Sequence, residues 1–378
     1  MTRDPEALAS PYVRGLIPYS PGKPVEEVER ELGVPDAVKL ASNENPLGPS
    51  PRAVDAIAAA LKNLHRYPDG GGYYLKARLA QKFGLTPEHF ILGNGTNELL
   101  ELAARVFLNP RDEAIYAHPS FVVYDMVAQV TGARKLRIPL KDYVHDLDAM
   151  AAAVSPRTKV LFVANPNNPT GTCVVPADLA RFMDRIPPDV IVIFDEAYYE
   201  YLPPDVQPDT VRYVREGRPA VVLRTFSKIY GLAGLRIGYG ITTPAMNEVL
   251  NRVRQPFNTN DLAQRGALAA LDDDEHVERC RLMNEEGKQF LAAELPPLGV
   301  RVVPTGANFF LVDVGRSGPA VADALLRRGV IVRAVHWAGL PTHLRITIGT
   351  PTENRKLLAA LREALFAIPA SPGGGVRG

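Results

Sequence analysis

Short runs of Val, Ile, Leu and Phe recur through the middle of the chain, separated by longer segments of mixed polarity. They are FILGN, EAIYAH, KLRIPL, VLFVAN, VIVIFDEAYY and AVVLRTFSK, all between residues 90 and 228. Because these runs hardly alternate with polar residues, they predict strands that are buried on both faces. The segments between them are long enough for crossover helices. The pattern therefore predicts an α/β fold with a mainly parallel central sheet and helices on both faces.

Helical patterns precede and follow this region. AVDAIAAALKNL, after Pro51, and YLKARLAQKFG, which should stop at Gly84, predict two helices. Residues 244–295 predict a long helical region, of the kind that connects domains. Beyond Leu298, the apolar runs FFLVD, VIVRAV and HLRITIGT alternate with helical patterns and predict a smaller C-terminal α/β domain.

The length of the chain supports a division into domains. Its 378 residues exceed the roughly 250 to 300 at which a single core usually stops growing. We expect an N-terminal arm (1–45) that packs with the small domain, a large domain (46–265), a small C-terminal domain (266–370) and a disordered tail (371–378).

Composition narrows the range of partners. The 43 basic and 42 acidic residues nearly balance, so we expect neither nucleic acid nor membrane as a partner, but a small molecule. Cys173 and Cys280 are isolated and the seven histidines lack ligand spacing, which argues against a metal site. The first residues lack the apolar core of a signal peptide, and a cytoplasmic location is expected.

The sequence TFSKIYGLAGLRIGY places a lysine, Lys228, directly after a buried-looking strand and before a glycine-rich turn. Burial lowers the pKa of an amine, and a neutral amine at a strand end can attack an aldehyde. Ser227 and Arg236 flank it with a hydroxyl and a cation, as a phosphate requires. The alternative is a solvent-exposed lysine that caps a strand.

A second anion site is predicted at GNGTNELL, which follows a strand and opens a helix. The backbone amides of Gly95, Thr96 and Asn97 should point out of the helix amino terminus. The segment lacks the pattern of a nucleotide P-loop or of a dinucleotide fold. A simple helix cap is the alternative.

These segments together resemble a known family. SKIYGLAGLRIGY is similar to the cofactor-lysine signature of the fold-type I aminotransferases that depend on pyridoxal 5'-phosphate (PLP). NPNNPTG (165–171), FDEAYYEY (194–201) and GNGTNELL (93–100) stand in the expected order, and KLASNENPLGPSP and LRITIGTPTEN also fit. The resemblance covers essentially the whole chain. It implies a PLP enzyme in which Lys228 carries the cofactor as a Schiff base.

The resemblance implies roles for further residues around the cofactor ring. Asp195 would keep the pyridine nitrogen protonated, as the electron sink requires. Asn168 and Tyr198, the latter one helical turn past Asp195, would bind the phenolic oxygen, and Phe121 would stack on the ring. Tyr67 resembles the tyrosine that a neighbouring subunit contributes to the phosphate, which implies a homodimer with a shared active site. Turn, cap and core roles are the alternatives for these residues.

The substrates implied are an amino donor and a 2-oxo acid. Arg345 resembles the arginine that binds the substrate carboxylate as a fork, and Arg333 and Tyr19 are further candidates for binding substrate anions. The arm and the GVIVR and LRITIGTPTEN segments are most similar to the histidinol-phosphate aminotransferase branch, which acts on L-histidinol phosphate and 2-oxoglutarate.

Other activities remain open from the sequence. His336 and Trp337 stand where small residues were expected, which favours an aromatic amino acid aminotransferase as the first alternative. The related threonine-phosphate decarboxylases, which are lyases, share the lysine, the aspartate and the arm. Transcription regulators with an aminotransferase-like domain carry an added DNA-binding module, for which the arm is too short.

Overall fold

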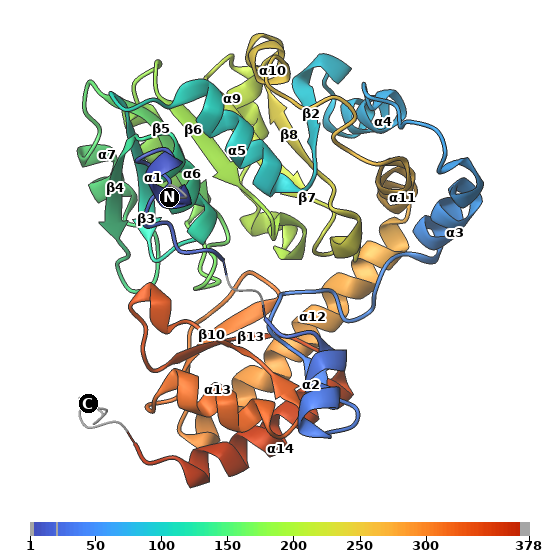
Figure 1. Ribbon diagram of the computed structural model, residues 1–378, viewed down its shortest axis with the longest axis vertical. Helices are drawn as coiled ribbons and strands as arrows, with labels where there is room; N and C mark the ends of the chain where they lie inside the picture. The colour runs from blue at the N-terminus through green and yellow to red at the C-terminus, as the bar shows by residue number, and fades with distance from the viewer. Residues whose placement is uncertain (1–3, 20–21, 371–378) are drawn as a thin grey trace.

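The computed structural model describes residues 4–19 and 22–370 (Figure 1). Within these residues, seven strands form the larger sheet, in the order β2-β8-β7-β6-β5-β3-β4. The strands β3 to β7 pair in parallel, which confirms the mainly parallel sheet of an α/β fold. The bounds are β2 (Phe90–Gly93), β3 (Glu113–His118), β4 (Arg134–Pro139), β5 (Thr158–Ala164), β6 (Ile191–Asp195), β7 (Ala220–Thr225) and β8 (Gly238–Thr242).

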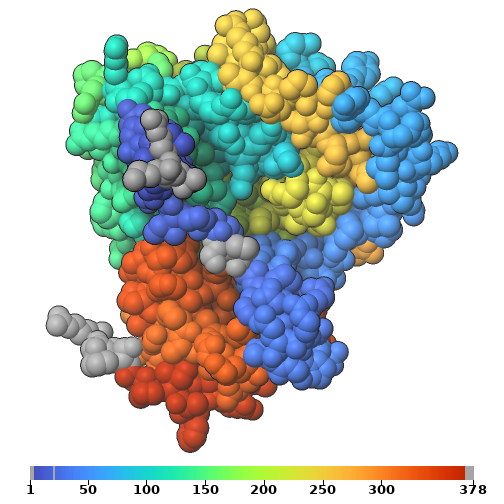
Figure 2. Space-filling view, viewed as in Figure 1, coloured from blue at the N-terminus to red at the C-terminus, as the bar shows by residue number. Residues whose placement is uncertain are grey.

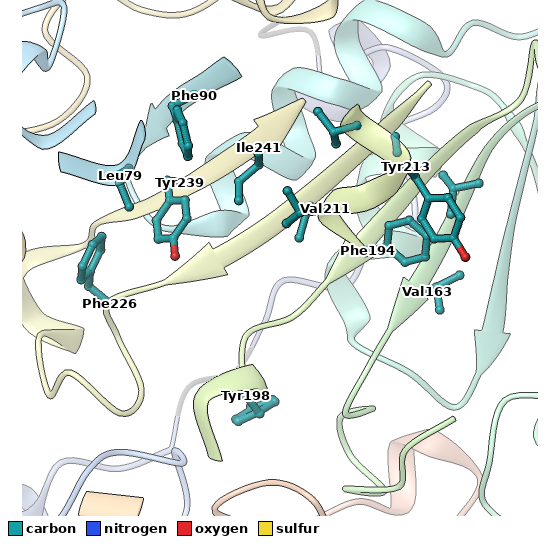
Figure 3. Close-up of a cluster of buried hydrophobic side chains, with 14 of the residues drawn as sticks. Leu79, Phe90, Val163, Phe194, Tyr198, Val211, Tyr213, Phe226, Tyr239 and Ile241 are labelled. Atoms are coloured by element: carbon teal, nitrogen blue, oxygen red, sulfur yellow. The ribbon is translucent and has the colours of Figure 1, made fainter. Parts of the chain in front are cut away.

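Both faces of this sheet are buried, which explains the near-continuous apolar runs. One face carries Phe90, Val163 and Phe194, which belong to a large cluster shown in Figure 3. The other carries Tyr116 and Phe162, packed in a second cluster. Each fully buried aromatic or branched side chain contributes about 1.5–3 kcal/mol, so the two clusters hold the sheet firmly.

Helices cover both faces, as predicted. Residues of α5, α6 and α10 pack in the second cluster, whereas α4, α7, α8, α9 and α11 contribute to the first. Gly84 ends α4 in the left-handed conformation, as the sequence predicted. The bounds are α3 (Pro51–Ala60), α4 (Tyr73–Phe83), α5 (Thr96–Phe107), α6 (Val122–Val130), α7 (Leu147–Ala152), α8 (Pro176–Arg185), α9 (Val211–Arg215), α10 (Pro244–Asn251) and α11 (Asp261–Leu271).

Three details of the prediction were wrong. The glycine-rich turn was taken to run to Tyr239, but strand β8 (GYGIT) begins at Gly238, and it pairs antiparallel with β2 and β7. KLRIPL was expected to be buried on both faces, but β4 is an edge strand with half-exposed residues, and only its apolar side chains face the core. The long helical region breaks at residues 252–260, between α10 and α11, and again at residues 272–273, between α11 and α12 (Asp274–Glu294).

A second, smaller sheet has the order β12-β13-β10-β9 and is antiparallel throughout. Its inner residues pack on α12, α13 and α14 in a separate apolar cluster (Figure 1). This confirms the predicted C-terminal combination of strands and covering helices. The bounds are β9 (Arg301–Val302), β10 (Phe309–Asp313), β12 (Arg333–Ala334), β13 (His343–Thr347), α13 (Gly318–Leu326) and α14 (Pro351–Ala367).

The N-terminal segments lie against both parts of the molecule (Figure 2). They comprise α1 (Pro5–Leu8), α2 (Val25–Leu32) and β1 (Val38–Lys39), and β1 pairs in parallel with β11 (Val330–Ile331). The boundaries of arm and domains stay predictions, and the predicted tail 371–378 lies outside the described residues. No helix within 4–19 or 22–370 is long and apolar enough to cross a membrane.

Candidate active site

A cavity of about 210 Å³ lies where strands β5, β6 and β7 end, between the two sheets. The carboxyl ends of parallel strands are the usual place for a ligand in an open α/β sheet, because the connecting loops diverge there. Predicted site residues that line the cavity are Tyr19, Thr96, Asn97, Phe121, Asn168, Asp195, Tyr198, Ser227, Lys228, Arg236 and Arg345.

Lys228 extends into this cavity just after β7. Its Nζ lies 3.3 Å from the carbonyl oxygen of Ser42, to which it donates, and 5.6 Å from the centre of the Tyr198 ring. Burial, together with the positive charge of Arg345, lowers the pKa of Lys228 to about 8. Near neutral pH the amine is therefore neutral, and nucleophilic, in a far larger fraction of molecules than an exposed lysine would be.

Asp195 ends β6 and is buried. Its Oδ2 accepts a hydrogen bond of 2.7 Å from the hydroxyl of Tyr124, whereas its Oδ1 has no hydrogen-bond partner. Burial raises the pKa of Asp195, while the Tyr124 hydrogen bond and the charge of Lys228 act in the opposite direction. A buried carboxylate oxygen without a partner is costly, and this one is suited to a cationic N–H group of a ligand.

Tyr198 and Asn168 line the same cavity as Lys228. Tyr198 was expected one helical turn past Asp195, but it sits in a turn before the short 3-10 helix η3 (Tyr199–Tyr201). Its hydroxyl accepts a 2.9 Å hydrogen bond from Asn43, and burial raises its pKa. The Oδ1 of Asn168 accepts a 2.7 Å hydrogen bond from Arg345.

Another part of the cavity lining is suited to an anion. Helix α5 begins at Thr96, so its free amides point at the cavity wall, as predicted from the sequence. Arg236 reaches the same place, where its Nη1 lies 3.3 Å from the hydroxyl of Ser227. Gly95 caps the helix with φ 74°, and an added Cβ there would lie 2.5 Å from Arg236 Nη2. The amides, hydroxyl and guanidinium together offer a dense set of donors.

A pair of arginines faces the cavity region from the smaller sheet. Arg333 and Arg345 lie directly opposite one another on β12 and β13. Arg345 donates 2.6 Å to the carbonyl of Ala41, and its Nε is buried without a partner. The guanidinium of Arg333, outside the lining, lies 5.3 Å from the ring centre of Tyr19. Like charges directly opposite repel, so this pair is suited to a bound anion.

The residues thus fit an aromatic cofactor with a cationic ring nitrogen, an anionic group and an aldehyde for the lysine. The family model described as aminotransferase class I and II matches residues 35–361. The chain belongs to this family.

Individual relatives agree. The aminotransferase is 52% identical to a histidinol-phosphate aminotransferase of Moorella thermoacetica, over 93% of this chain and 92% of the relative. It is also 52% identical to histidinol-phosphate aminotransferase 2 of Ralstonia nicotianae, over 95% and 98%. A solved histidinol-phosphate aminotransferase of Sinorhizobium meliloti, in complex with pyridoxal-5'-phosphate, superposes with a TM-score of 0.87 at 28% identity, covering 95% of this chain and 98% of that one.

Three predicted residues of the aminotransferase lie outside the cavity lining, namely Arg333, Tyr67 and Gly95. Tyr67 is 82% exposed and stacks on Phe257, with ring centres 4.7 Å apart, at a separate hollow. Gly95 contributes only its backbone. His336 and Trp337, which favoured an aromatic substrate, are both exposed and do not line the cavity, so nothing in the geometry favours that alternative.

Three residues of the site were missed from the sequence. Tyr124 bonds Asp195, Asn43 bonds Tyr198, and the carbonyl of Ser42 accepts from Lys228. The only signal was their position, three residues after Phe121 in the segment HPSFVVY (118–124) and in the arm motif KLASNENPLGPSP. No group of three or more His, Cys, Asp or Glu side chains placed to hold a metal occurs within 4–19 or 22–370.

Proposed function

We propose that this aminotransferase transfers the amino group of L-histidinol phosphate to 2-oxoglutarate, giving imidazole acetol phosphate and L-glutamate, with PLP as its cofactor. The observation that carries the proposal is the cavity itself, whose lining combines Lys228 with an unpartnered carboxylate oxygen and with donors suited to an anion. The names of the relatives at 52% identity support the donor, and with it a role in histidine biosynthesis.

Each end of the cavity would hold one part of the cofactor. The free Oδ1 of Asp195 would accept from the ring nitrogen and keep it protonated. The amides of Gly95, Thr96 and Asn97, with Ser227 and Arg236, would bind the phosphate. When bound, PLP supplies an electron sink for the pair of electrons left at the substrate carbon.

Lys228 would hold the cofactor covalently until the donor amine displaces it. The freed amine, with its pKa lowered to about 8, is then suited to take the proton from the substrate carbon as a general base. Tyr198 and Asn168 would hold the phenolic oxygen of the cofactor, and Phe121 would stack on the ring. These positions tune how strongly the lysine is held.

Arg345, Arg333 and Tyr19 would bind the substrate anions. The donor carries a phosphomonoester and the acceptor two carboxylates, so the pocket must accept an anion away from the reacting carbon in both halves of the reaction. The facing arginines of β12 and β13 offer two positive charges for this purpose.

Tyr67 would act in the neighbouring subunit. Its exposure, beside the exposed Tyr73 and Tyr74, suits a contact with a second copy of the chain and a tyrosine donated to the partner's phosphate site. The protein would then be a homodimer with a shared active site. A cytoplasmic location stays a prediction from the sequence.

The substrate is tested with a panel of amino donors, by following the absorbance of the bound cofactor as each donor is added. Histidinol phosphate should convert the aldehyde form to the amine form, and phenylalanine should do so much more slowly. The opposite ranking would contradict the proposed donor while leaving the enzyme class intact.

The role of Lys228 is tested separately. After borohydride reduction of the loaded enzyme, peptide mapping by mass spectrometry should find the cofactor on Lys228. A label on any other residue would show that the wrong lysine was chosen.

A further inference from the structure

A hairpin turn outside the cavity carries a tyrosine in an unusual backbone conformation. Lys141 and Val144 exchange two backbone hydrogen bonds of 2.9 Å. The two residues between them, Asp142 and Tyr143, have φ angles of 49° and 66°. Turns of this kind favour Asn, Asp and Gly, and a bulky residue with positive φ is an outlier. Such strain persists where surrounding contacts hold the residue in place.

The side chain of Tyr143 reaches the smaller sheet. Its ring packs against a small apolar cluster that includes Val303, Leu311 and Val335. Its hydroxyl lies 3.0 Å from Nε2 of His343, at the start of β13. His343 and Arg345 are two residues apart on this strand, so both side chains project from the same face. The contact between Tyr143 and His343 therefore restrains the part of β13 from which the side chain of Arg345 projects.

The backbone of Tyr143 is tied to the loop that carries Asn168. Its carbonyl accepts a 2.6 Å hydrogen bond from the hydroxyl of Thr172. That hydroxyl lies 2.8 Å from the hydroxyl of Thr170, which in turn accepts 2.9 Å from Asn167 Nδ2. All three of these side chains are buried. The chain of contacts ends one residue before Asn168.

These contacts form a closed circuit, because Asn168 Oδ1 accepts a hydrogen bond of 2.7 Å from Arg345 Nη1. One series of contacts leads from Tyr143 through His343 and along β13 to Arg345. The other leads from Tyr143 through Thr172 to the segment that carries Asn168. His145 fixes the base of the hairpin, since its Nε2 lies 2.8 Å from the carbonyl of Ala164 at the end of β5. Burial lowers the pKa of His145 to about 4, so this ring is neutral and its Nε2–H donates.

The packing around the ring is open on one side. A cavity of about 410 Å³ lies beside the hairpin, lined by Tyr143 and Thr172 and by Arg301 and Asp313 of the smaller sheet. With that side unfilled, the hydrogen bonds at its hydroxyl and carbonyl, rather than close packing alone, determine where Tyr143 lies.

We propose that Tyr143 is a positioning residue. It holds the side chain of Arg345 in place beside Asn168, where Arg345 binds the substrate carboxylate. Tyr143 does not line the active-site cavity, and it acts through His343 and Thr172. The proposal rests on the proposed function, because it takes Arg345 as the carboxylate ligand.

The test is Tyr143→Phe in the PLP-loaded enzyme, which keeps the ring and removes the hydroxyl. The KM for 2-oxoglutarate should rise about three- to tenfold, as expected for one lost hydrogen bond, while kcat stays within about twofold. A residue that only stabilises the fold would lower the melting temperature and leave KM unchanged. That result would overturn the proposal.

A matched control and a second variant sharpen the test. Asp142→Gly alters the neighbouring position of the same turn without touching either hydrogen bond, and should leave KM unchanged. In His343→Leu the same contact is removed from the other side, so the double variant with Tyr143→Phe should raise KM no more than one change alone. Fully additive increases would contradict the route through His343.

The test of Tyr143 does not depend on the identity of the amino donor. If histidinol phosphate is not a donor, the KM for 2-oxoglutarate can be measured with whichever donor reacts. The same rise in Tyr143→Phe would then still support the positioning role.

Discussion

At Asp195, only one of the two buried carboxylate oxygens has a hydrogen-bond partner. Asp195→Asn keeps the shape but removes the charge that would hold the ring nitrogen protonated. We expect kcat to fall on the order of 100-fold or more, measured under saturating PLP. Tyr124→Phe is the milder control: losing its hydrogen bond should raise the pKa of Asp195 further and lower kcat about two- to tenfold. Equal activity of Asp195→Asn and wild type would remove Asp195 from the cofactor site.

The lowered pKa of Lys228 predicts a pH dependence for loading the cofactor-free protein. Only the neutral amine reacts with the aldehyde, so the rate of covalent PLP attachment should rise with pH and level off above about 8. Because the charge of Arg345 contributes to the lowering, Arg345→Leu should move the midpoint upward. Stopped-flow absorbance across pH 6 to 10 measures both. A wild-type midpoint near 10.5, the ordinary pKa of an exposed lysine, would mean that the lysine is solvated.

Individual site residues could be predicted from the sequence where a reactive residue type stands in a recognisable motif. Lys228 and Asp195 follow buried strands and could be chosen for their residue type alone. Tyr124 could not, because it falls within an ordinary helical pattern and only its position in three dimensions brings it within 2.7 Å of Asp195. Asn43 reaches Tyr198 across 155 positions, which no local pattern reveals.

At the scale of elements, the amino terminus of α5 offers a direct test of the anion site. Gly95→Ala places a Cβ 2.5 Å from Arg236 Nη2, at a φ of 74° that alanine adopts poorly. The guanidinium must move away, so the dissociation constant for PLP should rise about tenfold or more, measured by equilibrium titration. Gly84→Ala is the matched control. It has φ 63° but open space around it, so it should cost about 1 kcal/mol of stability and leave PLP affinity unchanged.

Elements were predictable from the sequence where burial and composition agree. VIVIF and AVVLRT form the central strands β6 and β7, whose every residue is buried. β8 was missed because two of its five residues are glycines, which read as a turn. The reason for glycine there is close packing: a Cβ on Gly240 would lie 3.0 Å from Ile91 of the neighbouring strand. Tertiary contact thus overrides local propensity.

At the scale of the whole molecule, the site is assembled from segments far apart in sequence. The arm brings Ser42 and Asn43 beside Lys228, and it is anchored to the smaller sheet, where Asn43 N donates 2.9 Å to the hydroxyl of Thr347. This placement of Ser42 and Asn43 was missed from the sequence, because periodicity carries no information about which distant segments meet.

If the active site is shared between two subunits, two impaired variants should complement one another in a hybrid dimer. Variants of a self-contained subunit should not. Lys228→Ala and Tyr67→Ala should each impair the enzyme, the second by weakening PLP binding. In a hybrid of the two variants, one site combines Lys228 of one chain with Tyr67 of the other and is therefore intact. Random reassociation of an equal mixture should restore about a quarter of the wild-type sites, measured as activity at limiting PLP. Activity no greater than the mean of the two parents would mean that Tyr67 serves its own subunit or none.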